Sequence, residues 1–372
     1  LGRQSGRYRV GRGGSARGSA LGQVLTPKAL KLAPLGGRIL VVLLSFVGAT
    51  FVAEYSVRLT LPKYDPAGHV SFYTDSVTGV LLGRPNSRTR QIKNSGDYDV
   101  EIAFNRHGLR DRRDIANGTA RDLYVLGDSF AFGWGVEESE RFSSLLEKLT
   151  DRRVYNIATT ANLDGFERLL DFAAKQGAVI RDVVLAINMI DDVQDYDTAP
   201  APAPKRPKPL ATAFSIQGAK EFLLKNSAFY FLATSAIGSI DLVRQTFIRL
   251  GLVKTLKAVA GGVPGDRAVR STADRIVALS EAYNLTVMII PSRGLWVGNK
   301  QKETAAAHRR FSEALIRRGL DIVDMRPVME ATGDPMQFHF RNDGHWVPKG
   351  HVLAARELAR RISRRQRDPG MK

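Results

Sequence analysis

The sequence predicts a three-layer α/β/α sandwich built on a parallel sheet of about five strands, preceded by one N-terminal transmembrane helix. Three observations lead to this fold class. From residue 122 onward, short apolar runs alternate with segments of helical periodicity, which is typical of strand–helix–strand units. These runs are apolar throughout, as strands buried on both faces are. Near the N-terminus, one longer apolar stretch fits a membrane helix.

The composition is that of a folded protein with strongly basic ends. Of 372 residues, 44% are hydrophobic, which is enough for a core, and the net charge is +18. Residues 1–38 contain basic but no acidic side chains, and arginines recur from 360 to 367. Such ends are usually solvated, and some bind anionic lipid. Because there is no zinc-finger spacing or aromatic-rich basic pattern, we expect no nucleic-acid partner. The lack of cysteine excludes disulfides and thiolate metal sites.

The N-terminal region is expected to anchor the chain in a membrane. Residues 1–35 are rich in Gly, Ser and Arg and predict a disordered cytoplasmic tail. The apolar segment Ile39–Ala53 makes about 22 Å of helix, and a signal anchor over 36–57 is long enough to cross a bilayer. A cleaved signal peptide and a buried helix are the alternatives. The basic flank favours a single-pass inner or cytoplasmic membrane protein whose main domain is periplasmic or extracellular.

Residues 58–121 predict a lead-in segment that packs on the main domain, with short strands near Val70–Tyr73 and Tyr98–Phe104. His107 lies in this segment within the sequence FNRHGLRD. A surface or structural role is the simpler interpretation of this histidine, because the sequence identifies no partner for it.

The main domain is predicted at residues 122–363. Its expected strands are Leu123–Leu126, Arg153–Ile157, Val179–Ile187, Leu285–Ile290 and Asp321–Val323. Its expected helices are Phe142–Leu149, Phe166–Gln176, Ala273–Tyr283, Ala305–Arg318 and Gly350–Ile362.

An insertion at residues 197–265 interrupts this domain, and a basic tail is expected at 364–372. The proline-rich part, Ala199–Pro209, predicts an extended, exposed spacer. Residues Ala219–Leu256 predict helices. Their apolar stretch Ala228–Ile240 is short for a second membrane span, which favours a core helix, a lid or an interfacial segment.

A candidate nucleophile follows the first strand of the main domain. The run Leu123–Leu126 ends abruptly in Gly127, Asp128 and Ser129. A polar side chain at the carboxyl end of a parallel strand lies where ligands bind. The alternative is that Ser129 only caps the next helix.

A candidate base lies near the end of the domain. Three of the six histidines fall in the segment His339–His351, on a loop expected at the same sheet edge as Ser129. Asp343 precedes His345 by two residues, so its carboxylate can orient one ring nitrogen while the other faces the serine. His351 opens the last helix and is more simply a structural or capping residue.

These motifs resemble the SGNH/GDSL hydrolase superfamily. The blocks are Gly127-Asp128-Ser129-Phe130 near the start of the domain and Asp343-Gly344-His345-Trp346 near its end. More narrowly, the chain looks like bacterial members that have one N-terminal membrane helix and a similar lead-in segment before the serine block. The resemblance implies a flavodoxin-like sandwich that hydrolyses acyl or acetyl esters. It assigns Ser129 as nucleophile, His345 as base and Asp343 as the orienting acid.

The chain departs from the family pattern in three places. Asn342 stands where the acid usually lies, so Asp343 gives an Asp-X-His arrangement that related alginate-acetylation proteins also have. The second block lacks its usual glycine, and Asp191 occupies the usual asparagine position of the third. The candidates for the oxyanion site are therefore Ala158, Asn162, Asn188 and Asp191.

The sequence thus predicts an extracytoplasmic serine esterase acting on a small-molecule or carbohydrate ester. An O-acetyltransferase of a surface polysaccharide and a catalytically impaired binding protein on the same fold are the alternatives. We expect no metal and no organic cofactor, because the chain has neither metal-ligand spacing nor a glycine-rich dinucleotide or phosphate loop.

Overall fold

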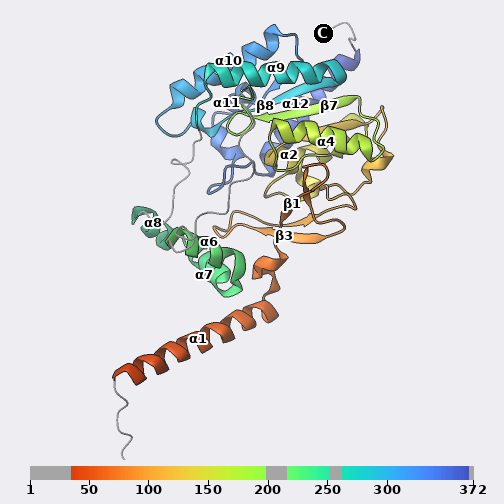
Figure 1. Ribbon diagram of the computed structural model, residues 1–372. Helices are drawn as coiled ribbons and strands as arrows, with labels where there is room; N and C mark the ends of the chain where they lie inside the picture. The colour runs from red at the N-terminus through yellow and green to blue at the C-terminus, as the bar shows by residue number, and fades with distance from the viewer. Residues whose placement is uncertain (1–34, 198–215, 251–261, 368–372) are drawn as a thin grey trace, which may run out of the picture. The chain divides into compact units, whose positions relative to one another are not determined.

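The structure is a computed structural model that describes residues 35–197, 216–250 and 262–367 (Figure 1). The chain divides into two compact units, Leu1–Phe51 and Val52–Lys372. The predicted tail at residues 1–35, apart from its last residue, and the predicted spacer Ala199–Pro209 lie outside the described residues. The end of the chain beyond Arg367 does so as well.

Helix α1 spans Leu35–Thr60, three residues beyond the predicted end of the signal anchor. Its 26 residues make about 39 Å of helix, which exceeds the hydrocarbon core of a bilayer. Among the described residues it is the one helix long and apolar enough to cross a membrane. Its apolar side chains, such as Phe46 at 71% exposure, are not those of a buried core helix.

A five-stranded parallel sheet forms the centre of the main domain. Its order is β6-β5-β7-β8-β9, so the first strand lies inside the sheet and the second at its edge. This is the flavodoxin-like order, and it confirms the predicted fold class. The strands are β5 (Leu123–Gly127), β6 (Val154–Asn156), β7 (Asp182–Asn188), β8 (Asn284–Ile290) and β9 (Ile322–Asp324).

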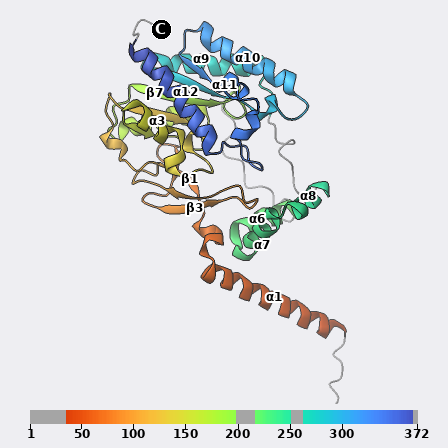
Figure 2. The same cartoon turned by 180° about the vertical axis from the view of Figure 1, so that it is seen from behind.

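Helices cover both faces of this sheet (Figures 1 and 2). Alternate side chains of β5 enter two separate cores, with Tyr124 and Leu126 in one and Leu123 and Val125 in the other. The first core includes α4 (Leu163–Lys175), α9 (Asp266–Ala282) and α10 (Gln301–Arg317). The second includes α2 (Ser129–Phe132), α3 (Phe142–Thr150), α11 (Met325–Glu330) and α12 (Pro348–Arg367). Helix α12 thus continues four residues into the predicted basic tail.

The lead-in segment folds into two antiparallel hairpins. The first pairs β1 (Phe72–Thr74) with β2 (Leu81–Gly83), and the second pairs β3 (Arg88–Ile92) with β4 (Asp99–Ala103). Side chains of β4 form a third apolar cluster with Phe132, Val136 and Phe340 of the main domain. Short 3-10 turns occur at Pro62–Tyr64, Pro66–Gly68, Ile115–Asn117, Glu138–Glu140, Arg293–Leu295 and Pro335–Phe338.

The described part of the insertion is helical, as the sequence predicts. It contains α6 (Ile216–Asn226), α7 (Ala228–Ser239) and α8 (Asp241–Arg249). The Phe231 ring of α7 lies against the rings of Tyr64 and His69, so this insertion packs on the lead-in segment.

Candidate functional site

Ser129 lies at the carboxyl edge of the sheet, at the first residue of α2. Strand β5 is buried along its whole length and delivers the chain to this edge. Gly127 permits the sharp turn, because a Cβ there would lie 2.8 Å from the Ala186 carbonyl oxygen. Asp128 then caps α2 by accepting the Phe130 N–H at 2.9 Å. Since β5 and β7 flank the point where the strand order reverses, Ser129 occupies the usual ligand position of such sheets.

The structure brings Ser129, His345 and Asp343 together. The Ser129 Oγ lies 2.8 Å from the His345 Nε2, and the His345 Nδ1 faces the Asp343 Oδ1. The loop is fixed by a bridge between His339 and Trp346 and by the Phe340 N–H, which donates to the His345 carbonyl at 3.0 Å. This serine, histidine and carboxylate chain is the arrangement that nucleophilic acyl chemistry requires.

Two residues of the lead-in segment hold the carboxylate of Asp343. Lys93 Nζ lies 2.6 Å from Asp343 Oδ2, and the Tyr98 hydroxyl donates to the same oxygen at 3.3 Å. Both lie beside the turn between β3 and β4, about 250 residues away in the sequence. Burial alone would raise the pKa of Asp343, but the hydrogen bond from His345 and the charge of Lys93 hold it well below its usual value. Asp343 therefore remains ionised.

Aromatic rings enclose the imidazole of His345. The Trp134 ring is stacked on it, with centroids 5.6 Å apart, and the Phe130 ring lies 5.0 Å away. The Trp134 Nε1 donates to the Tyr98 hydroxyl at 2.8 Å, which connects this ring to the Asp343 contacts. The sequence analysis missed Lys93, Tyr98 and Trp134. Only Trp134 carried a local signal, since it lies between two glycines directly after α2.

The side-chain amide of Asn188 is occupied by two carboxylates. Its Nδ2 donates to Asp128 Oδ2 at 2.8 Å and to Asp191 Oδ2 at 3.2 Å. Ala158 donates its N–H to the side chain of Asn156 at 3.1 Å. Two candidates for the oxyanion site therefore already have partners, and Asp191 serves as an acceptor for Asn188.

Asn162 differs from these residues. It caps α4, and its Oδ1 accepts the Gly165 N–H at 3.3 Å. Its NH₂ group makes no hydrogen bond among the described residues. The loop that carries it follows β6, the neighbour of β5, so it emerges at the same edge of the sheet as Ser129.

A cluster of carboxylates surrounds Asn188. Burial raises the pKa of Asp128 to about 6, although hydrogen bonds from Asn188 and Phe130 oppose this shift. Burial also raises the pKa of Asp192 well above its usual value, and the nearby Asp128 charge adds to this effect. The Asp192 Oδ2 accepts the Asn188 N–H at 2.8 Å, while its buried Oδ1 makes no hydrogen bond in the described structure.

Three of the other histidines, His107, His308 and His351, have local structural partners, whereas neither ring nitrogen of the buried His339 makes a hydrogen bond in the described structure. His107 lies 2.7 Å from Asp114, and His308 lies 2.9 Å from Asp324. His351 is buried and accepts the Phe142 N–H at the start of α3, and burial lowers its pKa to about 3. The described residues contain no group of three or more metal-ligating side chains.

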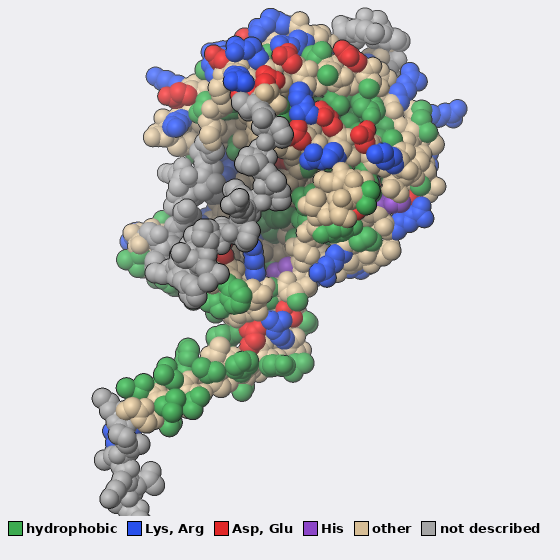
Figure 3. Space-filling model, viewed as in Figure 1, with side chains coloured by type: hydrophobic (Ala, Val, Ile, Leu, Met, Phe, Trp, Pro, Cys, Tyr) green, Lys and Arg blue, Asp and Glu red, His purple; other side chains and the backbone are tan. Residues whose placement is uncertain are grey.

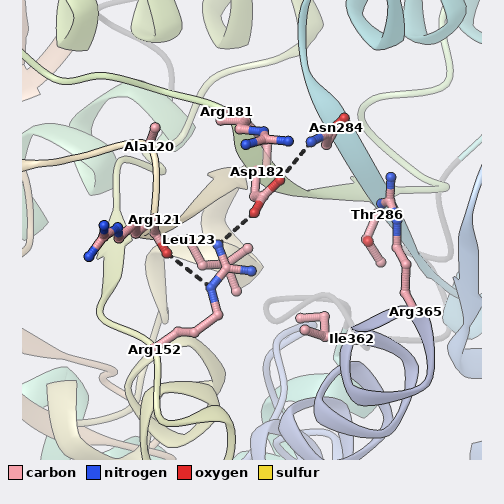
Figure 4. A pocket seen from close by; sticks show the side chains of 11 residues that line it. Ala120, Arg121, Leu123, Arg152, Arg181, Asp182, Asn284, Thr286, Ile362 and Arg365 are labelled. Carbon is pink, nitrogen blue, oxygen red and sulfur yellow. Dashed lines mark hydrogen bonds and ion pairs between the residues drawn. The ribbon is translucent and has the colours of Figure 1, made fainter. Parts of the chain in front are cut away.

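A pocket of about 500 Å³ lies at the opposite edge of the sheet (Figure 4). It is lined by residues at the amino ends of β5, β7 and β8 and by four arginines: Arg121, Arg152, Arg181 and Arg365. Arg152 is paired with Asp182 at 2.6 Å. Because this pocket lies at the amino ends of the strands, whereas Ser129 follows the carboxyl end of β5, it is separate from the candidate active site.

Comparison with known proteins points to one family. Residues 277–371, which include Asp343 and His345, match the model of a family described as SGNH hydrolase-like domain, acetyltransferase AlgX. No curated protein sequence matches the chain.

Several solved structures resemble the fold loosely. A member of the lipolytic protein G-D-S-L family from Veillonella parvula DSM 2008 is 8% identical, over 65% of this chain and 98% of that chain, with a TM-score of 0.38. Est24, a carbohydrate acetylesterase from Sinorhizobium meliloti, is 9% identical over 66% of this chain and 99% of that chain, with a TM-score of 0.35. A catalytic mutant of Axe2, an acetylxylan esterase from Geobacillus stearothermophilus, is 13% identical over 66% of this chain and 95% of that chain, with a TM-score of 0.35.

The family match and the motifs agree with each other. The matched model covers the end of the domain, where the Asp343 and His345 block lies, and the Gly127-Asp128-Ser129 block lies upstream of it. The end of this chain, residues 277–371, is thus similar to an SGNH hydrolase-like family, which agrees with the SGNH/GDSL resemblance that the motifs indicate.

Proposed function

We propose that this protein is a membrane-anchored serine esterase that cleaves an acyl or acetyl ester outside the cytoplasm. The observation that carries the proposal is the chain of contacts from Ser129 Oγ to His345 Nε2 and from His345 Nδ1 to Asp343. An assembled chain of this kind favours catalysis over a binding role, because a binding protein does not need the serine beside a base.

The reaction would proceed through a covalent acyl-serine. Ser129 Oγ attacks the ester carbonyl carbon while His345 Nε2 takes its proton. The resulting imidazolium is stabilised by the Asp343 carboxylate. His345 then returns the proton to the departing alcohol oxygen as the ester C–O bond breaks. Water, deprotonated by His345, then attacks the carbonyl carbon of the acyl-serine. The bond between that carbon and Ser129 Oγ breaks, His345 returns the proton to Oγ, and the carboxylic acid leaves.

The tetrahedral oxyanion would be held by the Ser129 N–H at the start of α2 and by the NH₂ group of Asn162. The amide of Asn188 is committed to Asp128 and Asp191, so it cannot turn to the substrate without breaking both contacts. A single side-chain donor of this kind contributes about 10²- to 10³-fold to the rate.

An O-acetyltransferase is the second candidate. It uses the same acyl-serine but passes the acyl group to a sugar hydroxyl in place of water. The acetyltransferase description of the matched family favours it. The two reactions differ only in the final acceptor, so the triad geometry supports both equally.

Anchoring rests on α1, which is long and apolar enough to cross a bilayer. We place its N-terminus in the cytoplasm because basic residues are concentrated before the apolar segment. The domain after α1 then lies on the opposite side of the membrane.

Hydrolysis of a short-chain nitrophenyl ester by the purified full chain in detergent tests the proposal. Ser129→Ala and His345→Ala should each lower kcat/KM by at least about 10³-fold. Unchanged turnover in Ser129→Ala would contradict the mechanism. Adding an oligosaccharide acceptor separates the two candidates. If acetylated sugar forms and the yield of free acetate falls, the protein is a transferase. If the acceptor leaves the yield of free acetate unchanged, the protein is an esterase.

A further inference from the structure

We propose that helices α6 to α8, residues 216–250, dock on the surface of the lipid bilayer that α1 enters. This inference rests on the proposed anchoring and goes beyond it, since it assigns a lipid-binding surface to the main unit itself. The partner is a phospholipid bilayer, bound through its headgroup and upper acyl region.

The insertion exposes an unusual number of large apolar side chains. Seven occur in residues 216–250, whereas the described residues 62–197 and 262–367 together expose five. The seven are Phe222, Leu223, Phe229, Ile237, Ile240, Leu242 and Leu250, with Leu242 the most exposed at 78%. Apolar patches of this density mark protein or membrane contacts. Figure 3 shows apolar side chains over this region as well as along α1.

The insertion is tied to the membrane helix at the point where its apolar segment ends. Glu54 directly follows Ile39–Ala53, and its carboxylate caps the start of α7. It accepts the Ser227 hydroxyl at 2.7 Å, the Ala228 N–H at 2.9 Å and the Phe229 N–H at 3.0 Å. Arg58, one turn further along α1, donates to the Asn226 carbonyl at 2.8 Å. The start of α7 is thus fixed where the chain leaves the hydrocarbon core.

The composition of the insertion fits an interfacial position. Its most apolar helix, α7, has 12 residues and is too short to span a bilayer. Lys225 and Arg249 are exposed among the apolar side chains. Basic residues beside an apolar helix surface attract anionic headgroups while the apolar side chains enter the acyl boundary. Lipid is therefore the occupant that suits both components of this surface.

Lipid quenching of single labels on the full chain tests the proposal. The sequence has no cysteine, so each variant carries one unique label. An environment-sensitive fluorophore is attached to Phe222→Cys or to Leu242→Cys. The labelled protein is reconstituted in vesicles of phosphatidylcholine and phosphatidylglycerol. These vesicles also contain a lipid that is spin-labelled near the headgroup end of its acyl chain and quenches nearby fluorophores. Val77→Cys and Val179→Cys are the matched controls, because these valines are 90% and 57% exposed outside the insertion.

The expected result is loss of emission at Phe222 and Leu242, with no loss at Val77 or Val179. Emission at Phe222 and Leu242 that matches the controls would overturn the proposal. The label could instead emit as it does in an apolar environment without being quenched by the spin-labelled lipid, and show energy transfer between labelled copies. This result would also overturn the proposal, because a second copy of the chain then covers the surface. A label at Phe46→Cys separates failure of the anchor from failure of the docking, since quenching there reports α1 alone.

A charge variant provides an independent measurement. Phe222→Asp combined with Leu242→Asp adds two carboxylates to exposed positions, so the fold should be retained. Quenching of a label at Leu250→Cys should then be lost while ester hydrolysis in detergent is unchanged. Retained quenching in this variant would contradict lipid docking.

Discussion

Asp343 is held more tightly than a carboxylate whose single partner is a histidine. It faces His345 through one oxygen and Lys93 and Tyr98 through the other. Lys93 does not reach Ser129 in the described contacts, so we regard it as a positioning residue. Its ammonium group fixes the carboxylate and offsets part of its charge.

Lys93→Met should lower kcat roughly ten- to a hundredfold with little change in KM, because a displaced Asp343 orients His345 less well. Lys93→Arg should restore part of the rate. Lys63→Met is the control, because Lys63 pairs with Asp99 at the surface. Equal kinetics for the two Met variants would exclude the positioning role.

Asp192 is a second residue whose environment has a measurable consequence. Its raised pKa means that the folded protein holds this proton more tightly than the unfolded chain does. The free energy of unfolding therefore falls as the pH rises above the usual pKa range of carboxyl groups. The decrease is complete once the pH exceeds the raised pKa of Asp192 in the folded protein. The neutral side chain of Asp192→Asn has no such dependence.

Asp192→Asn should therefore be more stable than the parent chain at pH 8, and the gain should shrink toward pH 4.5. Thermal unfolding in detergent at the two pH values measures this difference. The exposed substitution Asp171→Asn should change the stability little at either pH. A constant difference across the two pH values would show that Asp192 does not titrate in this range.

At the scale of elements, the turn between β3 and β4 links the insertion to the active site. It carries Lys93 and Tyr98 toward Asp343, and its Asn94 lies against the end of α7. The approach is close enough that a Cβ on Gly238 would lie 2.3 Å from the Asn94 carbonyl oxygen. Because the clash is with backbone, a side-chain rotation cannot relieve it.

Gly238→Ala should therefore shift this turn and lower kcat several-fold, although the same change in an open helix would stabilise it by up to about 1 kcal/mol. Hydrolysis rates and thermal unfolding should be compared with those of Gly68→Ala, where no atom lies within 4 Å of the added Cβ. A rate for Gly238→Ala equal to that of the control would show that the turn and α7 are not coupled to the site.

The elements that the sequence predicted best are those with the strongest apolar patterns. The five buried strands agree with the structure to within three residues because each is apolar on its buried faces. The five predicted helices are also present, but α9 begins seven residues before its predicted start and α12 ends five residues after its predicted end. Strand β3, Arg88–Ile92, was not predicted, since it is largely polar and its hairpin is stabilised by the apolar cluster of its partner β4.

At the scale of the whole molecule, the sequence predicts the site residues that lie in short motifs but not the contacts between residues that are far apart in the sequence. Ser129 and His345 were predicted because each belongs to a short motif that the superfamily shares. Lys93 and Tyr98 carry no such motif, and about 250 residues separate them from Asp343. Only the packing of the lead-in segment on the main domain brings them to the site. The occupied amide of Asn188 likewise depends on Asp128, 60 residues upstream.

The central claim is that Ser129 becomes acylated with His345 as its base. Intact-mass spectrometry after a brief incubation with an activated acetyl ester tests it most directly. We predict one added acetyl group on Ser129 in the parent chain, none in Ser129→Ala, and accumulation at least about 10³-fold slower in His345→Ala. Turnover of the ester without any adduct on Ser129, or an adduct that persists in Ser129→Ala, would contradict the claim.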